Sequence, residues 1–459
     1  MELQFGLQSY AHRSLPLSAQ RSINQYLEKA PEGSKTQYAN VQMHGIASFG
    51  TVGAGLMRGG LMVNGVPWVV SGEAAYTVDS SGVGTLKGAI PGSGLVDITS
   101  DGTNVLFAAD EAGYLWNGSA LALVADIDFA GAKVVDQLDG YALVVEPSSG
   151  RHFINENSGD WSAWNALDFA TAEAWPDDTL DLICDQEDAF LGGRETTEVW
   201  YNAGGADFPL LRRPGGVIQR GVLCTGTYAK QDNTIFFVGD DGVVYRLEGL
   251  TPMRISTHWV EQMIENLSPK VIRADAWSEA GHAFYSLTSA SWTLVFDVAT
   301  GFWHERQSPN YAYWKPLKIL RAYGKWLVLD STSNKIGYLS DSTFTEWGEV
   351  LRSSGTSTPI AKENRWIFHD TLELEFENGV GLLTGQGENP QVMIDWSNDG
   401  GRTWSAEHFR PLGKQGHYKE RATINRLGRS RDRIYRYAIS DPVRRTLVRA
   451  GFEGEVGEH

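Results

Sequence analysis

A loose internal repeat constrains this chain more than any other feature of its sequence. Between residues 58 and 348, a short apolar β-type run, a turn rich in Gly, Asp, Ser and Asn, and a second β-type run recur roughly every 40 residues. Six windows show the pattern: Asn104–Leu115, Gly140–Ile154, Asp188–Tyr201, Asn233–Leu247, His282–Phe296 and Lys325–Leu339. A seventh, weaker window runs from Leu61 to Val78. This spacing is typical of propeller blades, small sheets that bury their faces against copies of themselves.

The repeat predicts an all-β fold in which residues 58–348 form a β-propeller of six or seven blades. Aromatic residues close many of the predicted strands, and we interpret them as packing between blades rather than as a ligand platform. One stretch departs from the pattern. Ser256–Ser268 has helical spacing, with a cap at Ser256 or Thr257 and Pro269 beyond its end, so we expect a helix between two blades.

The segments before and after the repeat differ from it. Residues 1–57 are polar and are predicted to be extended, and they either complete the last blade or reach a neighbouring protein. A linker-like stretch, RSSGTSTPIAKEN, opens residues 349–459, where the predicted strands are longer and more regular. We predict a C-terminal β-sandwich of jelly-roll or immunoglobulin type, with strands at Trp366–Phe376, Val392–Ser397, Arg421–Leu427 and Arg433–Ser440.

The composition allows a large buried core and shows no membrane or secretion signal. Of 459 residues 42% are hydrophobic, but no apolar run reaches the 18 residues of a candidate membrane-spanning helix. The N-terminal MELQFGLQSYAHRS lacks the basic start and apolar stretch of a signal peptide. The two cysteines, Cys184 and Cys224, allow neither a disulfide framework nor a cysteine zinc site, and we interpret them as buried thiols. We therefore expect synthesis in a reducing cytoplasm.

Charge is divided unevenly along the chain. Residues 1–348 hold 40 acidic and 23 basic side chains, a net charge of −17, whereas residues 349–459 hold 16 of each. The acidic part is unsuited to gripping nucleic acid. Within residues 402–449, which hold eleven Arg and two Lys against four acidic residues, six arginines form a candidate subunit or partner interface: Arg421, Arg426, Arg429, Arg431, Arg433 and Arg436. An acidic partner, DNA phosphate and a solvated strand face are the three interpretations of this cluster.

The sharpest local motif is an Asp-box turn of the form S-x-D-x-G-x-T-W, made by Ser397, Asp399, Gly401, Thr403 and Trp404. In such a turn the carboxylate accepts hydrogen bonds from turn amides, the glycines permit the bend, and the Trp packs the turn onto its sheet. The pattern resembles the repeated boxes of sialidases, where it is structural. Because it occurs here once and outside the repeat, we interpret it as a structural turn.

No catalytic, cofactor-binding or metal-binding constellation stands out in the sequence. The motifs of zinc proteases, P-loop NTPases, α/β-hydrolases and EF-hands are missing. His258, His282 and His304 are expected in separate blades, and His408 and His417 in the sandwich, without metal-type spacing. The sequence therefore predicts a protein that is not an enzyme and that uses no cofactor.

Several short motifs occur in a distinctive order: Asn24–Glu28 with Pro31–Gly33, Met57–Gly60, Val69–Gly72 with Tyr76, Asp395–Gly401 and Arg426–Arg429. Together they resemble the packaged-DNA stabilisation proteins of short-tailed bacteriophages, also called tail accessory or tail hub proteins. The resemblance covers nearly the whole chain, and the C-terminal box followed by Arg-Leu-Gly-Arg keeps the family's form. Met1–Arg21 departs from it, since we place no counterpart for this segment.

This resemblance implies a structural virion protein without catalysis. Members of the family form a ring, usually of six copies, below the portal and its adaptor. The ring closes the DNA channel after packaging and offers sites to the tailspikes or fibres and to the tail plug or needle. Genome DNA would pass through it without sequence-specific binding, and the protein would reside in the virion tail after synthesis in the bacterial cytoplasm. An acidic channel wall would repel DNA phosphate, whereas the Arg-rich sandwich would hold an acidic neighbour.

Two other functions are alternatives. The Asp box and the aromatic content suit a glycosidase on a propeller scaffold, although the single box and the missing signal peptide argue against it. The nozzle protein of other short-tailed phages also combines propeller-like and sandwich-like parts. A glycoside screen tests the first alternative, and a mass measurement with and without the adaptor protein tests the second.

Overall fold

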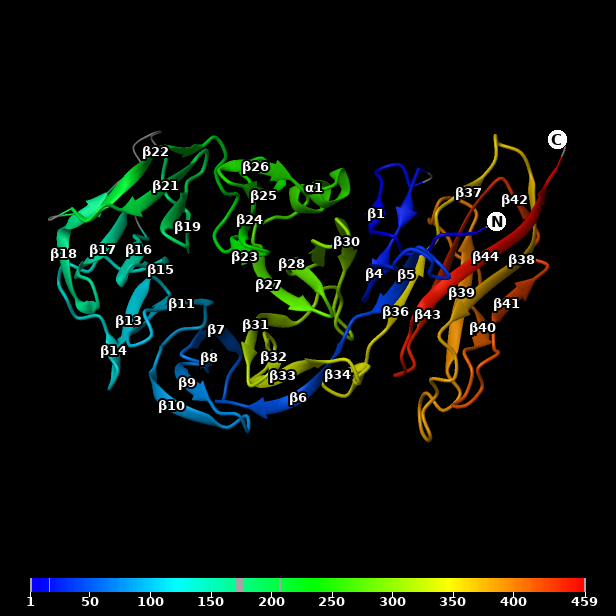
Figure 1. The fold of residues 1–459 in the computed structure, drawn as a ribbon, viewed down its shortest axis with the longest axis horizontal. Coiled ribbons are helices and arrows are strands. Elements are labelled where there is room, and N and C mark those ends of the chain that lie inside the picture. The colour runs from blue at the N-terminus through cyan, green and yellow to red at the C-terminus, as the bar shows by residue number, and fades with distance from the viewer. Residues whose placement is uncertain (1, 16, 148, 171–176, 206–207, 458–459) are drawn as a thin grey trace.

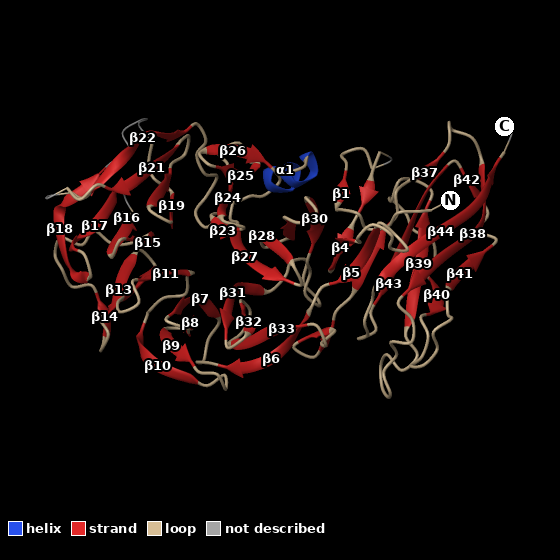
Figure 2. Ribbon diagram, viewed as in Figure 1, coloured by secondary structure: helices blue, strands red, loops and turns tan. Residues whose placement is uncertain are grey.

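The computed structural model describes residues 2–15, 17–147, 149–170, 177–205 and 208–457. Almost all regular structure in these ranges is β-strand, so the predicted all-β fold is confirmed. The chain forms two bodies side by side, a ring of small sheets and a sandwich of longer strands, and both ends of the chain lie at the sandwich (Figure 1; Figure 2). No helix in the described ranges is long and apolar enough to cross a membrane.

Within the described residues, the ring consists of seven four-stranded antiparallel sheets and is therefore a seven-bladed propeller. The first blade contains β7 (Met57–Val63), β8 (Val66–Ser71), β9 (Ala74–Val78) and β10 (Gly84–Ala89), and the second contains β11 (Val96–Ser100), β12 (Val105–Ala109), β13 (Ala112–Trp116) and β14 (Leu121–Leu123). The third blade contains β15 (Val134–Leu138), β16 (Tyr141–Val145), β17 (His152–Asn157) and β18 (Asp160–Ala170), and the fourth contains β19 (Asp181–Asp185), β20 (Asp188–Gly192), β21 (Thr197–Asn202) and β22 (Leu210–Ile218). The fifth blade contains β23 (Ala229–Gln231), β24 (Thr234–Val238), β25 (Val244–Glu248) and β26 (Thr251–Arg254). The sixth contains β27 (Arg273–Glu279), β28 (His282–Thr288), β29 (Thr293–Asp297) and β30 (Phe302–Glu305), and the seventh contains β31 (Pro316–Ala322), β32 (Lys325–Asp330), β33 (Lys335–Ser340) and β6 (Gly45–Thr51).

The windows of the sequence repeat coincide with the two central strands of each blade. Residues 104–115 hold β12 and β13, and residues 325–339 hold β32 and β33. The weaker window at residues 61–78 holds β8 and β9. Side chains of a strand point alternately to the two faces of its sheet, and both faces of a blade are covered by neighbours. Every residue of β12 is accordingly buried, which explains the continuous apolar runs.

The propeller closes because one blade combines both ends of the propeller sequence. β6 pairs antiparallel with β33, with Gly45–Thr51 opposite Lys335–Ser340. The inner strand β31 of the same blade lies beside β7 of the first blade (Figure 1). Val52 and Val69 share a hydrophobic core with Leu320 and Leu329 across this closure. Burial of that core offsets the entropy of joining segments that are far apart in the chain.

A continuous sheet joins the propeller to the sandwich. β3 (Ser22–Ile23) pairs parallel with β30 of the sixth blade and antiparallel with β36 (Ser353–Thr356) of the sandwich. The buried carboxylate of Glu305 reinforces the junction, since it accepts hydrogen bonds from Ser9 Oγ at 2.8 Å and from Arg21 Nε at 2.9 Å. The stretch at residues 352–364, which the sequence predicts to be a linker, thus contains ordered strands of the junction and the sandwich.

The C-terminal body is the predicted β-sandwich. One sheet contains β36, β37 (Ile360–Ala361), β43 (Asp432–Ile439), β39 (Gln391–Ser397) and β40 (His408–Pro411). The other contains β4 (Gln25–Lys29), β5 (Tyr38–Gln42), β44 (Leu447–Val456), β38 (Ile367–Phe376), β41 (Ala422–Asn425) and β42 (Arg429–Ser430). Leu3 and Phe5 lie in the sandwich core with Leu372 and Ile394. The N-terminal segment therefore supplies two strands and part of the core of the sandwich.

Helix α1 (His258–Glu265) lies between the fifth and sixth blades in chain order, as the sequence predicts. The Thr257 side chain caps it by accepting a hydrogen bond from Val260 N, and Trp259 and Ile264 are buried on its inner face. The helix packs beside the small hairpin of β1 (Tyr10–Ala11) and β2 (Ala19–Gln20). Two further short strands, β34 (Thr345–Glu346) and β35 (Glu349–Val350), extend the seventh blade beyond β6.

Aromatic residues of the repeat pack between blades. The rings of Trp68 in the first blade and Trp116 in the second lie 5.4 Å apart in an edge-to-face arrangement, and Trp68 shares a buried core with Phe107. Both cysteines are free thiols; Cys184 is buried and Cys224 is half-buried.

Candidate functional site

The Asp-box turn lies between β39 and β40 and uses its carboxylate entirely within the turn. Asp399 Oδ1 accepts hydrogen bonds from Arg402 N and Thr403 N, both at 2.9 Å, and Oδ2 accepts one from Thr403 Oγ1 at 2.6 Å. Ser397 Oγ donates to the same carboxylate and accepts from Gly401 N at 2.8 Å. These donors, Thr403 foremost, lower the pKa of Asp399 well below its ordinary value. The geometry gives this group a role in holding the turn.

The indole of Trp404 links this turn to the Arg-rich segment. Its Nε1 donates to Gly401 O at 3.2 Å, and the guanidinium carbon of Arg436 lies 4.0 Å from the ring centroid. Arg436 also forms a two-pronged ion pair with buried Asp395, in which Nε lies 3.0 Å from Oδ1. Arg436 is therefore engaged within the chain.

Arg433 is also engaged internally, because its side chain is buried. Only 2% of the residue is exposed, its Nε donates to Asn398 Oδ1 at 2.7 Å, and its Nη1 donates to Leu427 O at 2.7 Å. Arg421 is exposed and pairs with Glu373 at 2.7 Å. Arg426 is exposed and occupies a left-handed conformation, with φ of 59°, in the turn before β42. The six predicted interface arginines thus do not form one surface.

Two of the six arginines do lie together, and they share an aromatic platform. The guanidinium carbons of Arg429 and Arg431 lie 4.6 and 4.9 Å from the ring centroid of Trp366. Phe368 is directly opposite Arg429 across the β38–β42 pair, and its side chain is 44% exposed. Neither arginine forms an ion pair with any described residue, so stacking on Trp366 orients two guanidinium groups that retain free N–H donors. We call Trp366, Phe368, Arg429 and Arg431 the arginine platform.

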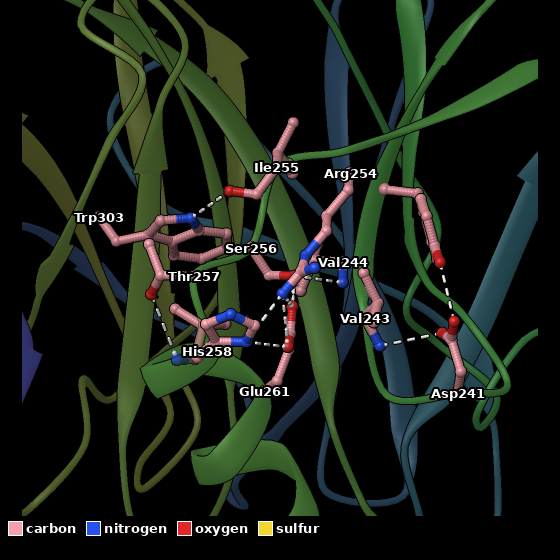
Figure 3. Close-up of polar contacts among 12 residues, drawn as sticks. Asp241, Val243, Val244, Arg254, Ile255, Ser256, Thr257, His258, Glu261 and Trp303 are labelled. Atoms are coloured by element: carbon pink, nitrogen blue, oxygen red, sulfur yellow. Dashed lines mark hydrogen bonds and ion pairs between the residues drawn. The ribbon is translucent and has the colours of Figure 1, made fainter. Parts of the chain in front are cut away.

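A cleft of about 640 Å³ lies between α1 and the β1–β2 hairpin. At its edge Arg254 Nη2 donates to Glu261 Oε2 at 2.8 Å, Ser256 Oγ donates to Glu261 Oε1 at 2.7 Å, and His258 Nδ1 lies 3.3 Å from the same carboxylate (Figure 3). Arg13 pairs with Glu265 across the cleft at 3.4 Å. These charged side chains are paired with one another and offer no obvious group for ligand binding or chemistry.

The sixth blade contains a buried charge that no local sequence pattern indicates. Arg306 is completely buried, and its guanidinium lies against the rings of Trp277 and Trp314, 4.7 and 4.6 Å from their centroids. Its nitrogens have no hydrogen-bond partner among the described residues, and the nearest carboxylate, Glu279, is 4.0 Å away. Burial lowers the pKa of Arg306 to about 10. Burial also acts to raise the pKa of Glu279, but hydrogen bonds from His44 and the charge of Arg306 lower it to about 2.

The histidines are less dispersed than the sequence suggests. His282 and His304 lie in one blade, on β28 and β30, and both rings contact Tyr26 of the N-terminal segment. His282 pairs with Asp297 at 2.9 Å, whereas burial lowers the pKa of His304. The expectation that the two occupy separate blades is wrong, because β28 and β30 are the second and fourth strands of one blade, and their separation in sequence is shorter than the blade repeat of roughly 40 residues. Among the described residues, no group of three or more His, Cys, Asp or Glu side chains could hold a metal ion.

Comparison with known families settles the identity of the fold. The model described as bacteriophage P22 Gp10, beta-propeller, matches residues 8–344, and the model described as bacteriophage P22 Gp10, beta-sandwich, matches residues 356–455. The chain belongs to the bacteriophage P22 Gp10 family. The resemblance to phage packaged-DNA stabilisation or tail hub proteins is thereby confirmed, and the P22 Gp10-like chain is a phage structural protein with a propeller and a sandwich. Membership also identifies it as a component of a virion.

Solved structures share the propeller at low identity, and no curated protein matches the chain. The Cps50 (Swd1) propeller domain of Myceliophteria thermophila is 8% identical, with a TM-score of 0.41 over 64% of this chain and 99% of that one. The Dos1 propeller is 11% identical, with a TM-score of 0.39 over 70% and 90%. The extracellular domain of BT4673 from B. thetaiotaomicron is 9% identical, with a TM-score of 0.45 over 88% and 59%. These scores are too low to carry a functional assignment.

Proposed function

We propose that this P22 Gp10-like protein forms a ring of six copies below the portal and adaptor of a short-tailed phage. In this role the ring closes the DNA channel after packaging and anchors the tailspikes or fibres and the tail plug or needle. Genome DNA passes through the ring without sequence-specific contacts. The role requires neither catalysis nor a cofactor, and it follows synthesis of the chain in the host cytoplasm.

The observation that carries the proposal is the continuous sheet between the two bodies. A closed ring that retains DNA under pressure needs subunits that transmit load without bending. Here β30, β3, β36 and β43 are consecutive strands of one sheet, so backbone hydrogen bonds run from the sixth blade into the sandwich. Rigid subunits that use different surfaces for each neighbour close into rings when the rotation between copies is fixed.

Charge supports the same role. Residues 1–348, which include the whole propeller, carry a net charge of −17 at neutral pH, whereas residues 349–459 are balanced. An acidic surface repels DNA phosphate, so a genome could slide past it without being held. The arginine platform, in contrast, lies on the sandwich, where it is available to a protein neighbour.

Particles assembled in host cells without this chain test the proposal. We expect heads that package DNA but lose it during purification, and we expect the purified chain to restore retention when it is added to adaptor-bearing heads. The mass added per particle should correspond to six copies. Particles that retain their genome without the chain but lack only the distal end of the tail would instead indicate a nozzle, and would overturn the proposal.

A further inference from the structure

The arginine platform has the chemistry of a carboxylate receptor. A guanidinium group offers planar paired N–H donors that match a carboxylate, and stacking on an indole fixes its plane before a partner arrives. Other arginines of the segment donate their hydrogen bonds within the chain: Arg433 donates to Leu427 O, and Arg436 donates to the Asp395 carboxylate. Arg429 and Arg431 are exposed, and neither forms an ion pair with any residue that the structure describes.

A protein carboxylate fits this platform better than DNA phosphate does. Strand β44, which carries Glu453 and Glu455 on its exposed face, pairs with β38 beside the platform, and Glu455 lies directly opposite Phe368. A polyanion that runs along the surface would meet these carboxylates and the acidic propeller. A short loop that bears a carboxylate can reach the two guanidinium groups without passing over Glu453 and Glu455.

The propeller of the same chain carries such loops. Asp139, Glu187 and Asp232 lie in the turns after the inner strands of the third, fourth and fifth blades and are exposed. Asp185 is the last residue of the inner strand of the fourth blade and is half-buried. Among the described residues, none of these four carboxylates forms an ion pair; the pair in this region belongs to Asp188 and Arg213.

Two observations bring these loops together. Gln186 Nε2 and Asn233 Oδ1 are 3.4 Å apart, which links the loops of the fourth and fifth blades. Burial raises the pKa of the Cys184 thiol, and the charge of Asp136, followed by those of Asp139 and Asp185, raises it further, so Asp139 and Asp185 both lie near one group. The nearby cation, Lys230, donates to the carbonyl oxygen of Cys184. We call Asp139, Asp185, Glu187 and Asp232 the acidic loop patch.

We propose that the arginine platform of one copy binds the acidic loop patch of a second copy of this chain. The proposal rests on the proposed function, because two different surfaces that recognise each other give the head-to-tail contact from which a ring is closed. It names the surfaces of that contact. Association by this route strengthens at low ionic strength, since both faces are exposed and oppositely charged.

Sedimentation velocity of the purified chain at increasing protein concentration and low salt tests this contact. We expect self-association that salt weakens, and a rise in Kd on the order of 100-fold in Arg429→Glu/Arg431→Glu, because each exchange replaces a charge-assisted contact by repulsion. Adding Asp185→Lys/Glu187→Lys to that variant inverts both faces and should restore association. Neither acidic position has a left-handed backbone, so the Lys exchanges introduce no strain of that kind.

Arg321→Glu is the matched control. Arg321 is exposed and lies 5.2 Å from the ring centroid of Trp326 in the seventh blade, so it has the same stacked chemistry at another place. It should associate like the wild type. Wild-type chain that stays monomeric at every concentration, or an Arg429→Glu/Arg431→Glu variant that associates normally, would overturn the inference. DNA retardation abolished by the same variant would assign the platform to phosphate instead.

Incorporation into particles separates this inference from the proposed function. If Arg429→Glu/Arg431→Glu still enters tails and retains the genome while the chain-free particle leaks, the ring role stands and these surfaces are not its contact. If the wild-type chain itself fails to stop leakage, the ring role fails, whatever the sedimentation result.

Discussion

Replacing Asp181 by Asn should stabilise the propeller at neutral pH and change it much less in mild acid. Asp181 lies on the inner strand β19 of the fourth blade and is buried. Its Oδ2 accepts a hydrogen bond from Gly226 N at 2.8 Å, and its Oδ1 accepts one from Leu182 N at 3.0 Å. The side chain therefore ties the fourth blade to the segment that enters the fifth.

The magnitude follows from the pKa of this carboxyl. Burial raises it from 3.8 to about 7, even though the backbone donors oppose the shift. Since the folded-state pKa lies above the unfolded one, the folded protein holds a proton that the unfolded chain has released between these two values. The stability from the protonated form is complete below pH 3.8 and is lost as the pH rises through about 7. The loss is about 1.4 kcal/mol per pH unit, and about 4 kcal/mol in total.

Chemical unfolding of the wild type and Asp181→Asn between pH 5 and pH 8 measures this effect. Asn keeps one oxygen acceptor and adds an N–H₂ group, so a constant offset is expected as well. The difference in free energy of unfolding should nevertheless move in favour of the variant by about 3 kcal/mol from pH 5 to pH 7 and beyond. A difference that does not vary with pH would refute the reasoning. Asp126→Asn is the control without pH dependence in this range: bonds from Asp128 N and Trp164 N lower the pKa of Asp126, so above pH 5 this carboxyl is ionised in both the folded and the unfolded chain.

Three further changes test other parts of the fold. Arg306→Ala should lower the free energy of unfolding by about 3–5 kcal/mol, because it opens a cavity beside the indoles of Trp277 and Trp314 and removes the buried guanidinium from Glu279. Arg306→Met fills the space and should cost less than half of that in the same unfolding assay. Gly45→Ala should destabilise the closing blade by about 3 kcal/mol in thermal unfolding, since the added Cβ would meet the carbonyl oxygens of Thr343 and Thr345 at 2.3 and 2.5 Å. Gly451→Ala is its control and should be nearly neutral, because no atom lies within 4 Å of the Cβ that would be added there. Glu305→Ala removes the acceptor of the hydrogen bonds from Ser9 and Arg21, so it should loosen the N-terminal segment and accelerate tryptic cleavage after Arg13 and Arg21 roughly 10-fold. Unchanged cleavage rates would show that backbone pairing alone holds this segment.

Much of the propeller was predictable because its signal is local. The central strands of each blade are covered on both faces, so they are apolar runs joined by short turns. The edges were not predictable in this way. β10 has no buried residue and therefore no apolar pattern. β44 is a strand of ten residues, but Gly451, Gly454 and the adjacent Glu453 and Glu455 interrupt the apolar alternation that would predict it. Its place in the sandwich depends on pairing with β38, which is a long-range contact.

The candidate site was predicted only in part, for a topological reason. A strand that ran through residues 429–433 would place Arg429, Arg431 and Arg433 on one face. The chain instead crosses between sheets at this point, because β42 pairs with β38 while β43 pairs with β36 and β39. Arg433 consequently points inward, and the other two meet Trp366. The role of Trp366 depends on a register that the local sequence does not contain.

The N-terminal segment explains why the two bodies behave as one. β6 completes the seventh blade, β3 carries the sheet into the sandwich, and β4 and β5 belong to the sandwich itself. Tyr26 and Met43 in this segment pack against Trp277 and Phe284 of the sixth blade. The sandwich therefore cannot reach its full set of strands until the first and last parts of the chain have met. A boundary drawn at residue 348 would leave the seven blades complete but would separate β3, β4 and β5 from the sandwich sheets that contain them, so the sandwich depends on the N-terminal segment.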